Sequence, residues 1–441
     1  MNNKMKINNV SNNNLNKKIG LFSAIFLGLG SMIGAGIFAL LGEAGTIAGN
    51  QVYISFIIGG IIALLSGYSF AKFAQKYPSR GGIIEYLTQS YGEGIFTGFV
   101  SILFYLSSLI AIAMVTKTFG IYASNIFGFL NINFYHNIFA ILLLVILVFI
   151  NLMGIFYAVI FENFIVIFKL LILLVLGLIS FIYIKPVNLI SSGISNVPNI
   201  FYAIGLTFFA YEGFRVITNT IEDLEKPNEN IMKAMIYSIL IVMVLYVIIS
   251  LGVFGTFTVS QVQKYKEYVL AEVAKNILGR AGFILVALTA LISTASSVNA
   301  NLYGISNVTY TMAKKGELPK IYYRKIHHSY EGLLISSILL ILIILFLDLT
   351  QIAIIGSISI LFIHLFVHIG HFKKIKETKA NIFLILLAIF GSFSVVILVL
   401  IYSIKNMPSI ILYLGFGIVI AFILELILRI KFNRIIKKQI N

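Results

Sequence analysis

Long apolar runs separated by short polar segments dominate the chain from residue 19 onward. The runs are continuous rather than alternating, and each can form the helix of ~20 residues that crosses the hydrocarbon core of a bilayer. They predict an all-α integral membrane protein of about twelve transmembrane helices. The expected spans lie near residues 20–42, 52–73, 95–122, 137–153, 156–184, 199–222, 232–257, 281–312, 333–348, 351–370, 381–402 and 409–430.

The polar segments predict how the chain is oriented. Residues 1–18 are rich in Asn and Lys and are expected to form a disordered tail, and residues 431–441 form a second, basic tail. With both tails on one side, 23 of the 32 Lys and Arg residues fall on that side and 7 on the other. This bias predicts a multi-pass protein of the cell membrane with both termini in the cytoplasm. The mixed charge of residues 258–280 predicts a helix on the outer surface.

Composition excludes several other classes of protein. The chain is 59% hydrophobic and 11% charged, so its net charge of +16 is a topology signal and predicts no nucleic-acid partner. The absence of cysteine excludes disulfides and thiolate metal sites. His364, His368 and His371 repeat at helical spacing, but no nearby carboxylate or cysteine completes a set of metal ligands. We therefore expect neither a metal nor a cofactor.

Two spans contain glycine-rich interruptions at corresponding places. One run covers residues 30–38 of the first span, and the other covers residues 205–214 of the sixth. Either run alone is explained by close packing of helices on small residues. Their occurrence five spans apart favours an inverted-repeat transporter with broken helices and a site at the bilayer midplane. The expected units are residues 19–184, their inverted copy over 198–371, and two further helices over 380–430, in one transporter domain over 19–430.

Several ordered motifs carry a family resemblance. They read GSMIGAGIF in the first span, PSRGGIIEYL after the second, FFAYEGFRVITNTIEDLEKPNENIMKA through the sixth, and NANLYGISNVTYTMAKKGELP at the end of the eighth. Together they resemble the amino acid–polyamine–organocation superfamily of permeases, most closely its archaeal proton-coupled amino-acid transporters of broad specificity. One departure is Asn307, where many members have Arg. The resemblance implies the fold of sodium symporters and amino-acid transport by alternating access.

The broken helices offer backbone groups to a zwitterionic substrate. Free N–H groups at residues 34–36 suit a carboxylate, and carbonyls at residues 32–33 and at Phe209 and Glu212 can accept from an ammonium group. The rings of Phe209 and Tyr211 can close over a substrate side chain, or they pack against neighbours or lipid. The predicted substrate-binding residues are Met32, Ile33, Gly34, Ala35, Gly36, Phe209, Tyr211 and Glu212.

Lys169 lies inside the apolar fifth span, where a charged side chain is costly. Its ammonium group either reaches the membrane surface or has a function in transport. The resemblance implies the second, because a lysine at this place in archaeal relatives replaces the sodium ion that bridges the first and eighth spans. Burial favours the neutral amine, which allows a protonation cycle. Candidate partners in the eighth span are Ser293, Thr294, Ser296 and Ser297, of which some are expected to bond back to their own helix.

Three alternatives stay open from the sequence. Glu212 and Arg215 are three residues apart and can form an internal ion pair, or Glu212 can attract a cationic substrate, which would make the protein an exchanger of cationic amino acids or polyamines. A substrate sensor on a transporter scaffold is another possibility. An intramembrane enzyme is not expected, because no recognisable nucleophile or acid–base motif is present. The expected partners are protons, lipid and a small amino-acid substrate.

Overall fold

The computed structural model describes residues 18–128, 132–153, 159–190 and 197–431. The tails expected over residues 1–18 and 431–441 lie outside these ranges, apart from one residue each. The described chain is helical almost throughout, with a single pair of short antiparallel strands, β1 (Lys325–Ile326) and β2 (Ser329–Tyr330). This architecture confirms the all-α membrane fold that the apolar runs predict.

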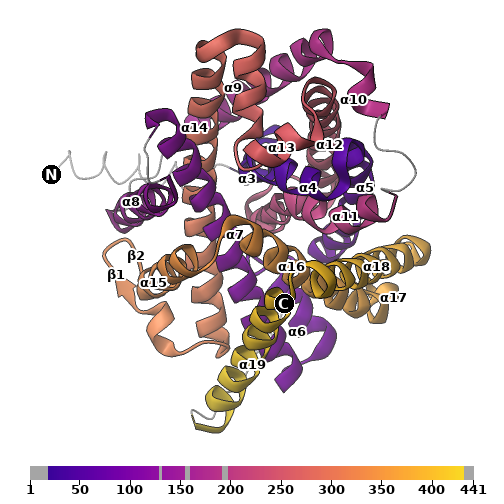
Figure 1. Cartoon of the computed structure of the whole chain (residues 1–441). Helices are drawn as coiled ribbons and strands as arrows, with labels where there is room; N and C mark the ends of the chain where they lie inside the picture. Colours follow the sequence, from indigo (N-terminus) through magenta and orange to yellow (C-terminus); the bar gives the residue numbers. More distant parts are fainter. Residues whose placement is uncertain (1–17, 129–131, 154–158, 191–196, 432–441) are drawn as a thin grey trace, which may run out of the picture.

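Figure 1 labels most of the helices, which follow one another along the chain. The first part contains α2 (Leu21–Met32), α3 (Ala35–Phe38), α4 (Leu40–Ala48), η1 (Gly49–Gln51), α5 (Val52–Lys76), α6 (Ile83–Tyr91), α7 (Ile95–Phe127), α8 (Ile132–Met153), α9 (Val159–Ser180), η2 (Phe181–Tyr183) and α10 (Pro186–Ile190). The second part contains α11 (Val197–Tyr211), η4 (Glu212–Asp223), α12 (Pro227–Thr256), α13 (Val259–Tyr265), α14 (Val269–Lys315), η5 (Lys320–Tyr323), α15 (Glu331–Phe346), α16 (Leu349–Lys373), α17 (Ile375–Thr378), α18 (Ile382–Asn406) and α19 (Pro408–Lys431).

Eleven helical segments of the described residues are long and apolar enough to cross a membrane. The shorter α15, with 16 residues, is the twelfth apolar helix in the predicted order. The largest difference from the predicted bounds is α14, which begins well before residue 281 because a preceding helix joins it at Gly279, where φ is +67°. Helices α18 and α19 lie on the outside of the bundle (Figure 1), and many of their apolar side chains are exposed.

Both predicted interruptions occur, but they differ in kind. In the first span α2 ends at Met32, and α3 begins at Ala35 after Gly34, whose φ of −130° and ψ of −117° are not helical. In the sixth span α11 continues through Gly205 and changes at Glu212 into the 3₁₀-helix η4, which runs for 12 residues. Runs of 3₁₀-helix longer than 3–4 residues are uncommon and often mark a hinge. The sixth span therefore changes its helix type at Glu212, directly before Gly213, and its chain stays helical where the first span is broken.

The two interrupted spans cross in direct backbone contact. A Cβ atom on Gly36 would lie 2.7 Å from the carbonyl oxygen of Ala210, and one on Gly213 would lie 2.4 Å from the backbone nitrogen of Met32. Real Cβ contacts are not that short, so a side chain at either glycine would force the spans apart. The crossing fixes the ends of four helical segments around one point in the middle of the bundle.

Candidate functional site

A cavity of about 40 Å³ lies at this crossing. Five of the eight predicted substrate-binding residues line it, namely Met32, Ala35, Gly36, Phe209 and Glu212. Because a buried water needs roughly 10–15 Å³ of such space, the cavity holds about three waters.

The other three predicted residues lie beside the cavity rather than on its wall. Ile33 and Gly34 form the break itself and are buried. The hydroxyl group of Tyr211 donates to the carbonyl of Phe56 at 3.0 Å, and its ring packs against Phe56 and Tyr246. In this structure Tyr211 therefore supports the cavity from behind.

The carbonyls at the end of α2 already have partners. The oxygen of Met32 accepts from the N–H of Gly34 at 3.0 Å and from the hydroxyl of Tyr246 at 2.8 Å. The oxygen of Ile33 accepts from Lys169 at 2.6 Å and from the hydroxyl of Ser293. A carbonyl oxygen has two lone pairs, so both oxygens are fully used in this arrangement.

Lys169 lies near the middle of α9 and is only 1% exposed. Its ammonium group donates to the carbonyls of Gly30 at 2.9 Å and Ile33 at 2.6 Å, next to the break in the first span. Ser293 on α14 donates to the same Ile33 oxygen, so this carbonyl joins three spans. The ammonium group is held at the broken helix rather than at a membrane surface.

The remaining candidate hydroxyls of α14 behave differently. Thr294 donates to the carbonyl of Ala290 at 2.6 Å within its own helix, as the back-bonding alternative predicts. Ser297 lines the cavity and accepts from the amide of Asn301 at 3.3 Å. Ser296 is partly exposed. Among the four, Ser293 is the one that shares an acceptor with Lys169.

The expected ion pair of Glu212 and Arg215 is present on the inner part of the sixth span. Arg215 Nε lies 2.6 Å from Glu212 Oε1, and its guanidinium group lies 5.0 Å from the centre of the Phe104 ring. A third residue, His364 of α16, joins this pair, and its Nε2 lies 3.1 Å from Glu212 Oε2. The cavity wall is therefore close to neutral at Glu212. The described residues contain no cluster of three or more His, Cys, Asp or Glu placed to hold a metal ion.

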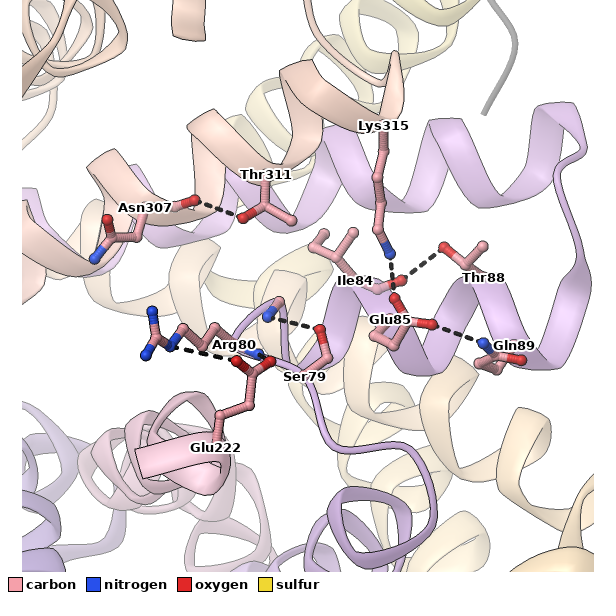
Figure 2. Close-up of polar contacts among 11 residues, drawn as sticks. Ser79, Arg80, Ile84, Glu85, Thr88, Gln89, Glu222, Asn307, Thr311 and Lys315 are labelled. Atoms are coloured by element: carbon pink, nitrogen blue, oxygen red, sulfur yellow. Dashed lines mark hydrogen bonds and ion pairs between the residues drawn. The ribbon is translucent and has the colours of Figure 1, made fainter. Parts of the chain in front are cut away.

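Ion pairs close one end of the bundle, here called the Arg80 end (Figure 2). Lys315 at the end of α14 pairs with the buried carboxylate of Glu85 in α6, which also accepts from Gln89 at 2.7 Å. Arg80 Nη2 lies 2.6 Å from an oxygen of Asp223, and its backbone N–H donates to Glu222 at 3.1 Å. Three sequence motifs that are far apart in the chain thus meet beneath the cavity.

A second polar cluster, here called the Lys266 end, closes the opposite side. Glu43 of α4 is 1% exposed and lies 3.2 Å from Lys266 Nζ and 3.0 Å from the hydroxyl of Thr350. A Cβ on Gly42 would meet the Lys266 carbonyl oxygen at 1.8 Å, so α4 lies directly on the segment between α13 and α14. In that segment, burial and the nearby carboxylate of Glu43 raise the pKa of Glu267. The cavity between the two clusters is not fully enclosed, because a second pocket that shares Arg215, Val216 and Asn301 with it continues to Gly304 and Val308.

Comparison with known proteins identifies the family of the chain. The family model described as amino acid permease matches residues 19–428. The chain belongs to the amino acid permease family. An uncharacterised protein of Methanocaldococcus jannaschii is 35% identical over 97% of this chain and 98% of its own length. The inner membrane transport protein YbaT of Escherichia coli is 30% identical over 85% of this chain and 87% of its own. The serine/threonine exchanger SteT of Bacillus subtilis is 27% identical over 70% of each chain.

The permease is thus a multi-pass membrane protein and a transporter rather than an enzyme. Arg80, Glu85 and Lys315 lie in the motifs quoted from the sequence. Their ion pairs at the Arg80 end could not be predicted from these motifs, because the partners are distant in sequence. Glu43 carried a usable signal, since an acidic residue in an apolar run needs a partner. His364 carried the same signal, but its spacing with His368 suggested only a metal site, which the sequence did not support.

Proposed function

We propose that the permease carries amino acids with neutral side chains by alternating access, driven by a proton gradient and independent of sodium. The observation that carries this proposal is the position of Lys169, whose ammonium group bonds to the carbonyls of Gly30 and Ile33 beside Ser293. A fixed cation at this place does the bonding work of a bound metal ion. A lysine can lose its proton when buried, whereas a sodium ion must leave, so the coupled event is protonation.

The cavity supports a zwitterionic substrate. The N–H groups of Ala35 and Gly36, at the start of α3 and on the cavity wall, could bind a substrate carboxylate, and Gly34 forms the turn before them. Because the carbonyls of Met32 and Ile33 already have two donors each, the ammonium group is assigned mainly to the side of Phe209 and Glu212.

The charge balance supports a neutral substrate side chain. The carboxylate of Glu212 already contacts Arg215 and His364, so it has little attraction left for a cationic amino acid or polyamine. The similarity to a protein named as a serine/threonine exchanger points in the same direction. An exchanger of cationic substrates is therefore the less favoured alternative.

The proposed cycle opens the two ends in turn. The positive-inside bias assigns the Arg80 end and both termini to the cytoplasm of the cell membrane and the Lys266 end to the outside. Opening the outer end separates Glu43 from Lys266, and opening the inner end separates Glu85 from Lys315. The inverted repeats over 19–184 and 198–371 would supply the two bodies that rock against each other.

Purified protein in liposomes tests the proposal. We expect a labelled neutral amino acid to accumulate when the outside is acidic, and an imposed sodium gradient alone to have no effect. Unlabelled neutral amino acids should compete, whereas arginine, lysine and polyamines should compete poorly. Accumulation driven by sodium, or exchange without any response to pH, would overturn the coupling mechanism. Strong competition by cations would establish the alternative substrate class.

A further inference from the structure

The three histidines of α16, here called the histidine row (His364, His368 and His371), have no task in the mechanism above. All three are fully buried, with 0% exposure. They lie along the part of α16 that runs from the cavity to the Arg80 end. At a rise of 1.5 Å per residue, the row covers roughly 10 Å of the helix. Three aligned imidazoles in an apolar bundle need a reason beyond packing.

Serine hydroxyls of α5 connect two of the rings. The Oγ atom of Ser69 lies 3.0 Å from Nδ1 of His368 and 2.8 Å from Nδ1 of His371. The other nitrogen of His368 lies 3.0 Å from the hydroxyl of Ser66, and the other nitrogen of His371 lies 2.9 Å from the hydroxyl of Thr378. The result is one unbroken line of hydrogen bonds from Ser66 to Thr378.

A single assignment of hydrogens satisfies every contact in this line with both rings neutral. Ser66 donates to Nε2 of His368, which donates through Nδ1 to Ser69. Ser69 donates to Nδ1 of His371, which donates through Nε2 to Thr378, whose hydroxyl donates to the carbonyl of Lys374. Ser69 and Thr378 each accept one hydrogen and give one, as a proton-conducting chain requires, and Ser66 gives one at the start of the line. All donors point from the cavity toward the Arg80 end.

His364 lies at the end of the histidine row that is next to the cavity. Nε2 of His364 lies 3.1 Å from the carboxylate of Glu212, which lines the cavity, although this close contact lacks the angles of a hydrogen bond. The rings of His364 and His368 are 6.0 Å apart between centroids and nearly perpendicular, and the Phe70 ring packs against both. A proton would cross between these two rings by rotation of the imidazoles or through one intervening water.

At the Arg80 end of the bundle, the histidine row lies next to charged groups. Thr378 ends α17, where Lys374 pairs with the carboxylate of Glu377 at 2.7 Å. The hydroxyl of Tyr77 also donates to this carboxylate. These hydrogen bonds, that of Lys374 first, keep the pKa of Glu377 below its usual value. The titratable and charged groups that face the row are Glu212 and Arg215 from η4, Lys72 and Tyr77 from α5 and its end, Tyr86 and Tyr91 from α6, and Lys374 and Glu377 beyond α16.

We infer that the histidine row is a proton path between Glu212 at the cavity and the Arg80 end of the bundle. This inference rests on the proposed proton coupling and adds a route by which a proton on Glu212 leaves the cavity. A proton on Glu212 passes to His364, then to Ser66 and His368, and each later group takes one hydrogen as it gives up another. Every N–H or O–H bond that breaks is replaced by one that forms, and the net change is one proton moved to Thr378 and released to water.

The test compares accumulation driven by a pH gradient with exchange of labelled for unlabelled substrate, which moves no net proton. The variants are His368→Gln, whose amide can keep the bonds to Ser66 and Ser69, and Ser69→Ala, which removes one oxygen atom. In both, we expect gradient-driven accumulation to fall by at least about tenfold while exchange stays within about twofold of the unmodified protein. The matched control is His136→Gln, which alters a buried histidine of α8 outside the row and should change neither readout.

The outcomes separate this inference from the proposed function. If the unmodified protein accumulates substrate with the pH gradient and both variants do so equally well, the row carries no protons. If the variants lose exchange and accumulation together while His136→Gln keeps both, the row is structural and the inference is wrong. If the unmodified protein itself ignores the pH gradient, proton coupling fails first, and the proton path fails with it. A dye that reports internal pH during uptake gives the second measurement.

Discussion

Replacing Lys169 by Met separates the role of its charge from the role of its bulk. Methionine preserves most of the buried stem, so little cavity is created, but both hydrogen bonds to the first span are lost. Ile33 keeps Ser293 as a donor. The carbonyl of Gly30 loses its bond from the lysine. The N–H of Gly34, four residues later, does not replace this donor because it bonds to the carbonyl of Met32. An orphaned buried acceptor costs about 1–3 kcal/mol, and the relief of burying an ammonium group offsets part of this.

We therefore expect Lys169→Met to fold, with its free energy of unfolding reduced by no more than about 1–3 kcal/mol, and to lose uptake driven by a pH gradient. Lys169→Arg should lose it too, because a guanidinium group stays protonated at any accessible pH. The assay is uptake into liposomes over a series of external pH values, with thermal unfolding in detergent as the stability control. In the unmodified protein, uptake should decline as external pH rises and the lysine loses its proton. Accumulation by the arginine variant in response to a pH gradient would refute Lys169 as the proton carrier.

Three further predictions concern the crossing and the two closed ends. Gly36→Ala should abolish transport and cost about 1–3 kcal/mol of stability, as measured by uptake and thermal unfolding, because its Cβ would lie 2.7 Å from a backbone oxygen. Lys315→Met leaves the carboxylate of Glu85 buried without its cation, which costs about 3–5 kcal/mol of stability. The variant should increase access to the cavity from the Arg80 end, as measured by alkylation of one introduced cysteine. Glu43→Gln should expose the cavity to the other end at a smaller cost, because Lys266 keeps access to water with its side chain 35% exposed.

Each of these has a control or an outcome that contradicts it. Gly415→Ala, where a Cβ would meet nothing within 4 Å, is the control for Gly36→Ala, and normal transport by the Gly36 variant would show that the spans can separate freely. The chain has no native cysteine, so labelling reports only the introduced residue. Identical labelling of the Lys315 and Glu43 variants from both sides would mean that these clusters do not close the ends.

The helices were predictable because a bilayer imposes length and polarity on each span independently of its neighbours. Lys169 could be singled out for the same reason, since a charge in an apolar run needs a local cause. Its link to the first and eighth spans came from the resemblance, and the contacts with Ile33 and Ser293 have the expected form. Its role in coupling stays a prediction.

Pairings between distant segments could not be predicted from the sequence. Glu212 and Arg215 are neighbours on one helix, and their ion pair follows from spacing alone. His364 reaches the same carboxylate only because α11, η4 and α16 pack together, and no local pattern records that packing. The hydrogen bonds between α5 and the histidine row depend likewise on how α5 and α16 are rotated about their own axes where they pack together. Single-residue polarity finds such groups, but not their partners.

The long 3₁₀-helix η4 makes the sixth span longer than the same residues would be as an α-helix. Its 12 residues, at about 2.0 Å per residue, extend roughly 24 Å. The same residues wound as α-helix at 1.5 Å per residue would extend roughly 18 Å. Rewinding would thus shorten the span by about 6 Å, close to one α-helical turn, and would draw Asp223 toward the cavity without breaking the chain's path. If the span changes length in this way, the distance between spin labels at Val216 and Leu224 should shorten when substrate is bound. An unchanged distance would show that the span keeps its length.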